Sequence, residues 1–132
     1  MGKAYDVMAA TCPSRTVLHR IGARWTVFVV TALADRTMRF GELKDHIQGI
    51  TPKVLTETLR ALEADGLVAR SEFDVHPPRV EYALTPLGQS LRVPLQSVRE
   101  WAETHVPEIH RAQRAAEEAR YPASDSSSAS NA

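Results

Sequence analysis

Four side chains able to recognise nucleic acid recur at helical spacing in GITPKVLTETLRALEADGLV, residues 49–68: Lys53, Thr56, Glu57 and Arg60. At roughly 100° per residue, the four fall within about 100° of one another on one side of a helix. Lysine and arginine bind phosphates or guanine edges, threonine offers a methyl or a hydroxyl, and glutamate accepts a hydrogen bond from cytosine. The alternative is the ordinary solvated face of an amphipathic helix.

The helix that would carry these side chains has clear start and stop signals. Thr51 is a suitable N-cap, Pro52 occupies the first turn, and Gly66 follows the last turn. The helix N-terminus, with the Thr51 hydroxyl, also suits a phosphate. The apolar side would consist of three leucines within about 60° of one another: Leu55, Leu59 and Leu62.

Downstream of this helix the hydrophobic period changes to two. The runs LVARSEFDV (67–75) and VEYALT (80–85) alternate, and the loop HPPR (76–79) joins them, which predicts a β-hairpin. The loop presents His76 and Arg79 beside two prolines that stiffen it. Arg79 could enter a narrow minor groove of DNA, whereas an ordinary exposed turn is the alternative.

The rest of the chain is predicted to be mainly helical. Helices are expected at 13–21, 23–35 and 40–47, with a short extended piece at 36–40. A long helix should begin after Thr85 and run to about His105 with a kink at Pro94, and Pro107 should begin a last helix. A helix, a short turn, a polar-faced helix and a hairpin form a winged helix-turn-helix, which docks its second helix in a DNA major groove.

Composition limits the classes of function. The chain has 132 residues, 43% of them hydrophobic, so one domain with a real core is expected without metals or disulfides. Sixteen basic and sixteen acidic residues cancel, so any basic surface must be local. A single cysteine, no run of about eighteen apolar residues and no signal-peptide pattern predict a soluble cytoplasmic protein without a membrane partner.

The sequence carries no sign of enzymatic chemistry. Its five histidines are scattered, none pairs at i, i+4, and no glycine-rich phosphate loop or nucleophile elbow is present. We therefore expect neither an enzyme nor a metal nor a cofactor.

Four runs of the sequence form a recognisable set: CPSRTVLHRIGARW, RFGELKDHIQGITPKVLTETLRALEADGLVAR, PPRVEYALTPLGQSL and REWAETH, within about residues 12–105. Together they resemble the HxlR family of bacterial transcription regulators, which are dimeric winged-helix proteins related to the MarR type. The resemblance implies a mainly α fold with a small β-hairpin wing, a recognition helix at 52–65 and a wing at 75–80. Thr58 departs from the pattern, because family members often carry a basic residue there.

The resemblance also implies a homodimer and a sensing thiol. Family members dimerise through the N-terminal and the long C-terminal helices, which gives interface roles to Val17, Leu18, Ile21, Leu95, Val98 and Trp101. Cys12, followed by Pro13, matches an N-terminal cysteine that senses oxidants or electrophiles in some members. Arg15 and Lys3 are close in sequence and a helix follows, features that lower a thiol pKa. An inert or half-buried cysteine is the alternative.

The expected organisation is an N-terminal arm at 1–12, a winged-helix domain with dimerisation helices at 13–106, a C-terminal helix at 107–120 and a flexible tail at 121–132. We expect a homodimer that represses transcription from a pseudo-palindromic double-stranded DNA operator, with half-sites about 10 bp apart or a multiple of it. Oxidants, electrophiles or a small effector are the expected signals. The alternative, motivated by the neutral total charge and by Thr58, is a winged-helix adaptor that binds proteins instead of DNA.

Overall fold

The computed structural model describes residues 4–122 of the chain. The chain divides into two compact units, the first ending at Gln96 and the second beginning at Ser97. The elements, in chain order, are α1 (Pro13–Ile21), α2 (Thr26–Leu33), β1 (Met38–Arg39), α3 (Phe40–His46), α4 (Pro52–Ala64), β2 (Val68–Phe73), β3 (Arg79–Leu84), α5 (Pro86–Gln89) and α6 (Arg92–Arg120). The predicted tail at 121–132 lies outside the described residues from 123 onward.

Local capping explains where α4 begins and ends. The Thr51 side chain accepts a hydrogen bond from the Val54 backbone N–H at 3.2 Å, and Pro52 occupies the first turn of α4. After α4, Gly66 has a φ of +76°, a left-handed conformation that side chains with a Cβ rarely adopt. The predicted N-cap, first turn and terminating glycine are therefore confirmed.

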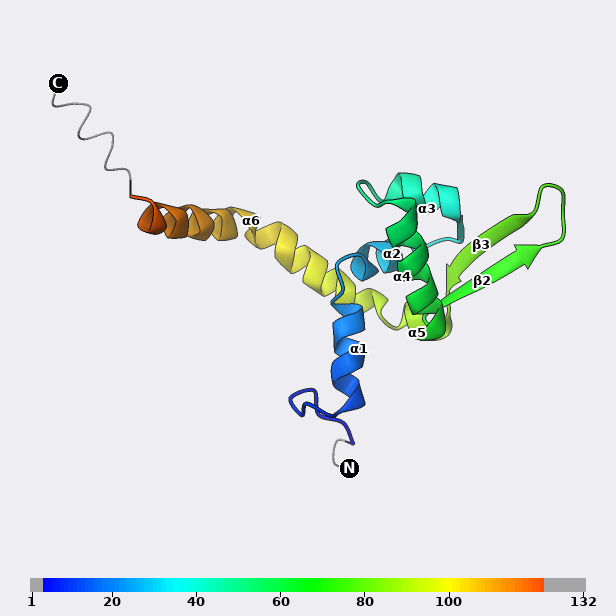
Figure 1. Cartoon of the computed structure of the whole chain (residues 1–132), viewed down its shortest axis with the longest axis horizontal. Helices are drawn as coiled ribbons and strands as arrows, with labels where there is room; N and C mark the ends of the chain where they lie inside the picture. The colour runs from blue at the N-terminus through cyan, green and yellow to red at the C-terminus, as the bar shows by residue number, and fades with distance from the viewer. Residues whose placement is uncertain (1–3, 123–132) are drawn as a thin grey trace, which may run out of the picture. The chain divides into compact units, whose positions relative to one another are not determined.

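The strands form one antiparallel sheet in the order β1-β3-β2. β2 pairs with β3 as the predicted hairpin, with Val68 opposite Leu84 and Arg70 opposite Tyr82. β1 adds a third strand by pairing Met38 with Tyr82, which the sequence had indicated only as an extended piece. Figure 1 shows the hairpin of β2 and β3 projecting beside α4, the arrangement of a winged helix-turn-helix.

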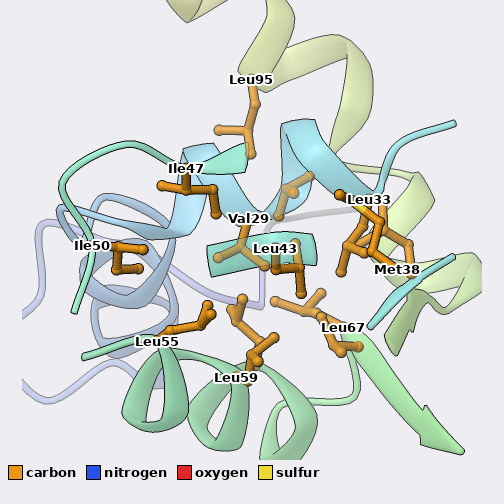
Figure 2. Packing of buried hydrophobic residues seen from close by; sticks show 14 residues of the cluster. Val29, Leu33, Met38, Leu43, Ile47, Ile50, Leu55, Leu59, Leu67 and Leu95 are labelled. Carbon is orange, nitrogen blue, oxygen red and sulfur yellow. The ribbon is translucent and has the colours of Figure 1, made fainter. Parts of the chain in front are cut away.

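The core of the first unit is built from side chains of α2, α3, α4 and the sheet (Figure 2). All three leucines of α4 (Leu55, Leu59 and Leu62) are buried, and they meet Val29 and Leu43 from the preceding helices. Each buried leucine contributes about 1.5–3 kcal/mol relative to an exposed one. This burial fixes which side of α4 faces outward.

The C-terminal helical region differs from the prediction. One helix to about His105 with a kink at Pro94 was expected, but α5 ends at Gln89 and α6 begins at Arg92. Pro94 therefore lies in the first turn of α6, where a missing N–H removes no helical hydrogen bond. The predicted new helix at Pro107 is also wrong, because α6 continues through Pro107 to Arg120. The loss of one hydrogen bond at Pro107 is offset by the alanine- and glutamate-rich turns that follow, whose residues favour helix.

The start of α2 also differs from the prediction. α2 is shorter than the predicted 23–35 because residues 22–25 form turns before Thr26.

Within residues 4–122, no helix is both long and apolar enough to span a bilayer.

Candidate nucleic-acid interface

The outward face of α4 carries the four predicted contact residues. Lys53, Glu57 and Arg60 are exposed, and Thr56 is half-buried toward the hairpin. Among residues 4–122, neither Lys53 nor Arg60 has an ion-pair partner within 4.0 Å. Both cations therefore remain available to an anionic ligand.

Thr51 at the N-cap of α4 and Thr58 in the middle of the helix have different roles. The Thr51 hydroxyl accepts the Val54 N–H, so its own proton is still free to be donated to a phosphate at the helix N-terminus. Thr58 is half-buried and donates its hydroxyl to the Val54 carbonyl at 2.8 Å. Thr58, the position at which family members often carry a basic residue, therefore lies away from the face that carries Lys53 and Arg60.

The hairpin presents its two predicted residues differently. His76 is exposed in the loop at 74–78. Arg79 begins β3, and its Nε lies 3.0 Å from Glu81 Oε2 while its guanidinium carbon lies 4.7 Å from the centre of the Phe73 ring. The guanidinium is thus held along the strands, and insertion into a minor groove would require it to leave both partners.

A groove between α4 and the sheet brings two of the predicted contact residues, Thr56 and Arg60, together with Arg70, which was not among them. It has a volume of about 350 Å³ and is lined by Thr56, Leu59, Arg60, Glu63, Arg70 and Tyr82. Arg70 lies on β2 opposite Tyr82 of β3. The alternation in LVARSEFDV placed Arg70 on the same strand face as Val68, which is buried, so a signal for the position of Arg70 was present.

Cys12 is the N-cap of α1 and lies in a small hydrogen-bonded turn. Its Sγ lies 3.0 Å from Ser14 Oγ and accepts the Asp6 backbone N–H at 3.1 Å. These hydrogen bonds, led by that from Ser14, lower the pKa of the Cys12 thiol because they stabilise the thiolate. The sequence predicts a lowered pKa from Arg15, Lys3 and the helix that follows. The lowering instead has its origin in the hydrogen bonds of Ser14 and Asp6, and Lys3 lies outside the described residues.

The residues predicted to contact a second copy fall into two groups. Leu95 is 7% exposed and packs in the core, and Ile21 is a partly buried side chain that packs against this core. Val17 and Leu18 on α1 are more than half exposed, as are Val98 and Trp101 on α6. Trp101 stacks on His105 with ring centroids 4.6 Å apart. Of the six residues, Val17 and Leu18 in the first unit and Val98 and Trp101 in the second are therefore exposed, whereas Leu95 is not.

Comparison with known proteins places this geometry in a family. The model of the HxlR-like helix-turn-helix family matches residues 20–110. The uncharacterized HTH-type transcriptional regulator YtfH of Escherichia coli (strain K12) is 40% identical over 107 residues, which covers 81% of this chain and 85% of that protein. The solved structure of YtfH from Salmonella typhimurium is 40% identical with a TM-score of 0.75, covering 83% of this chain and 97% of that one. The redox regulator HypR in its reduced form is 34% identical with a TM-score of 0.69, covering 75% of this chain and 98% of that one. The chain belongs to the HxlR-like helix-turn-helix family.

Proposed function

We propose that this protein is a transcriptional regulator that binds double-stranded DNA by placing α4 in a major groove. The observation that carries the proposal is the division of α4, which buries its leucines and leaves Lys53 and Arg60 uncovered. An α-helix with its side chains is about 10–12 Å wide, and the major groove is about 12 Å wide. The relatives named YtfH are described as transcriptional regulators, which agrees with this role.

Each side chain of the exposed face has a chemical task in such a complex. Lys53 and Arg60 bind phosphates or guanine edges, and the Thr51 hydroxyl at the helix N-terminus donates to a phosphate. Thr56 and Glu57 read base edges, because a methyl group can meet thymine and a carboxylate accepts from cytosine but repels acceptors. The phosphate contacts supply most of the affinity and make binding strongly dependent on salt.

A homodimer accounts for the apolar side chains that a single chain leaves uncovered. On α1 these include Val17 and Leu18, and on α6 they include Val98 and Trp101, which is 57% exposed. Aromatic residues such as Trp101 are enriched at protein interfaces. A symmetric dimer presents two copies of α4 and so selects a pseudo-palindromic operator, with half-sites about one helical turn, or roughly 10 bp, apart or a multiple of it. Repression follows when such a dimer occupies a promoter.

Cys12 is the proposed sensor of oxidants. Its thiolate attacks one oxygen of a peroxide, the S–O bond forms as the O–O bond breaks, and hydroxide leaves, so sulfur is oxidised to sulfenic acid while the peroxide is reduced. Because the chain has one cysteine, a subsequent disulfide joins two copies of Cys12 or attaches a small thiol, with loss of water. The neighbour HypR is described as a redox regulator, which supports this assignment.

A contact between α1 and the end of α4 gives the signal a route to the DNA-binding face. Arg20 Nε of α1 lies 3.1 Å from Asp65 Oδ2, directly after α4. A change at Cys12, or a small effector bound between the subunits, would move α1 and with it this contact. The signal acts by favouring one dimer geometry over another, which changes the spacing of the two α4 helices.

The proposal is tested with the DNA upstream of the protein's own gene in a mobility-shift assay with excess competitor. The full chain should bind saturably at low salt. The double charge reversal Lys53→Glu with Arg60→Glu should abolish the shift, whereas the matched reversal Arg111→Glu with Arg114→Glu on α6 should retain it. No saturable binding by the unaltered chain at low salt would contradict DNA binding and favour an adaptor.

A further inference from the structure

The groove between α4 and the sheet has a cationic side chain on each wall. Arg60 stands on the α4 wall and Arg70 on the β2 wall, while the buried Leu59 forms part of the floor. Glu63 on α4 adds a carboxylate to the same groove. The two arginines thus come from segments that approach one another only in the folded chain, on either side of an open channel.

Arg70 is held in place by its neighbours on the sheet. Its Nη2 lies 2.7 Å from Glu72 Oε1, and Glu72 is the more exposed partner, at 66% of its side chain against 36% for Arg70. Hydrogen bonding to Glu72 first, and to Tyr82 next, raises the pKa of Arg70. A guanidinium has five N–H donors, so these contacts orient it without using its full capacity. An exposed ion pair of this kind is weak and can be exchanged for another anion.

The geometry of B-DNA indicates what would pass through this groove. The major and minor grooves of a duplex are separated by one sugar-phosphate strand. If α4 lies in a major groove and the loop at 74–78 reaches the adjacent minor groove, that strand must cross the space between α4 and the hairpin. The groove lined by Arg60 and Arg70 occupies this space.

We propose that the groove seats a backbone phosphate of the operator between Arg60 and Arg70, and that Glu72 competes with this phosphate for Arg70. The inference rests on the proposed binding of DNA by α4. Arginine suits the position because its planar fork can make two parallel hydrogen bonds to phosphate oxygens. Glu72 then limits the affinity for DNA, since its carboxylate shares the positive charge of Arg70 with the phosphate.

The test measures binding of the full chain to its operator by fluorescence anisotropy over a series of salt concentrations. Arg70→Gln should weaken binding about tenfold for all DNA sequences and lower the salt slope by about one unit for each subunit. Arg70→Lys should keep most of the salt slope, because lysine retains the positive charge. Its affinity should lie between those of the unaltered chain and Arg70→Gln, because lysine lacks the planar guanidinium. The matched control is Arg36→Gln, which also removes an arginine paired with a glutamate, Glu42 at 3.8 Å, but lies outside the groove. It should retain affinity and slope.

Glu72→Gln gives the sharper result. It should strengthen binding severalfold in the unaltered chain and have no effect in an Arg70→Gln background, because the competition needs both residues. An equal gain in both backgrounds would show a general charge effect and overturn the role of Glu72. Unchanged affinity and slope in a folded Arg70→Gln variant, with binding still weakened by Lys53→Ala, would overturn the phosphate seat but leave the proposed function intact.

Discussion

Lys53→Ala should weaken DNA binding and make it less dependent on salt. Lys53 is exposed in the first turn of α4 and has no ion-pair partner among the described residues, so truncation should leave the fold intact. Each phosphate contact contributes about 0.9 to the slope of log affinity against log salt. A dimer loses two contacts, so the slope should become shallower by about 1.8. When the salt concentration rises fourfold, about 0.6 decades, the variant should therefore lose roughly tenfold less affinity than the unaltered chain loses.

The assay is fluorescence anisotropy of a labelled operator from about 50 to 200 mM salt, the range over which such contacts are strongly expressed. Arg114→Ala on α6 removes the same charge from an exposed position and should leave the slope unchanged. A slope equal to that of the unaltered chain, accompanied by a changed base preference, would identify Lys53 as a base reader and refute the phosphate assignment. An unaltered slope and preference would remove Lys53 from the interface.

Three further predictions concern the stability of the fold and the reactivity of Cys12. Gly88→Ala should destabilise the protein by several kcal/mol in thermal or urea unfolding, because the new Cβ would lie 2.1 Å from the Leu67 carbonyl oxygen, whereas Gly41→Ala, with nothing within 4 Å, should not destabilise it. A lower melting temperature for the Gly41 variant than for the Gly88 variant would refute this packing argument. Cys12→Ser should bind DNA as before but lose its response to peroxide or diamide, and a preserved response would end the redox assignment. Ser14→Ala should raise the pKa of the Cys12 thiol, so that alkylation by iodoacetamide at neutral pH becomes slower; an unchanged rate would mean that this hydrogen bond does not stabilise the thiolate.

Local signals predicted much of the fold and the main face of the candidate site. The bounds of α1 agree with the sequence because Pro13 and Gly22 act within a turn of their own positions. The same holds for α4, where Thr51, Pro52 and Gly66 define the ends. Helical spacing then determines that Lys53 and Arg60 share one side, since any helix of these residues places its leucines opposite.

The effects of Pro94 and Pro107 on the C-terminal helices could not be decided from local rules. Pro94 and Pro107 carry the same missing N–H, yet one lies harmlessly in a first turn and the other inside a continuous helix. Which outcome occurs depends on where α6 begins and on the strength of the surrounding helix. A single-residue rule has no access to either quantity.

The sequence by itself determined the order of the helices and of the hairpin as far as β3, the ends of α1 and α4, and which side chains α4 turns outward, because these depend on neighbours within a few residues. Tertiary structure alone decided that β1 joins the sheet, that Leu95 enters the core, and that Arg79 lies against Phe73. It also brought Arg70 to the groove beside Arg60. Such pairings join segments far apart along the chain, and their partners are selected by packing and strand register, which no local pattern encodes.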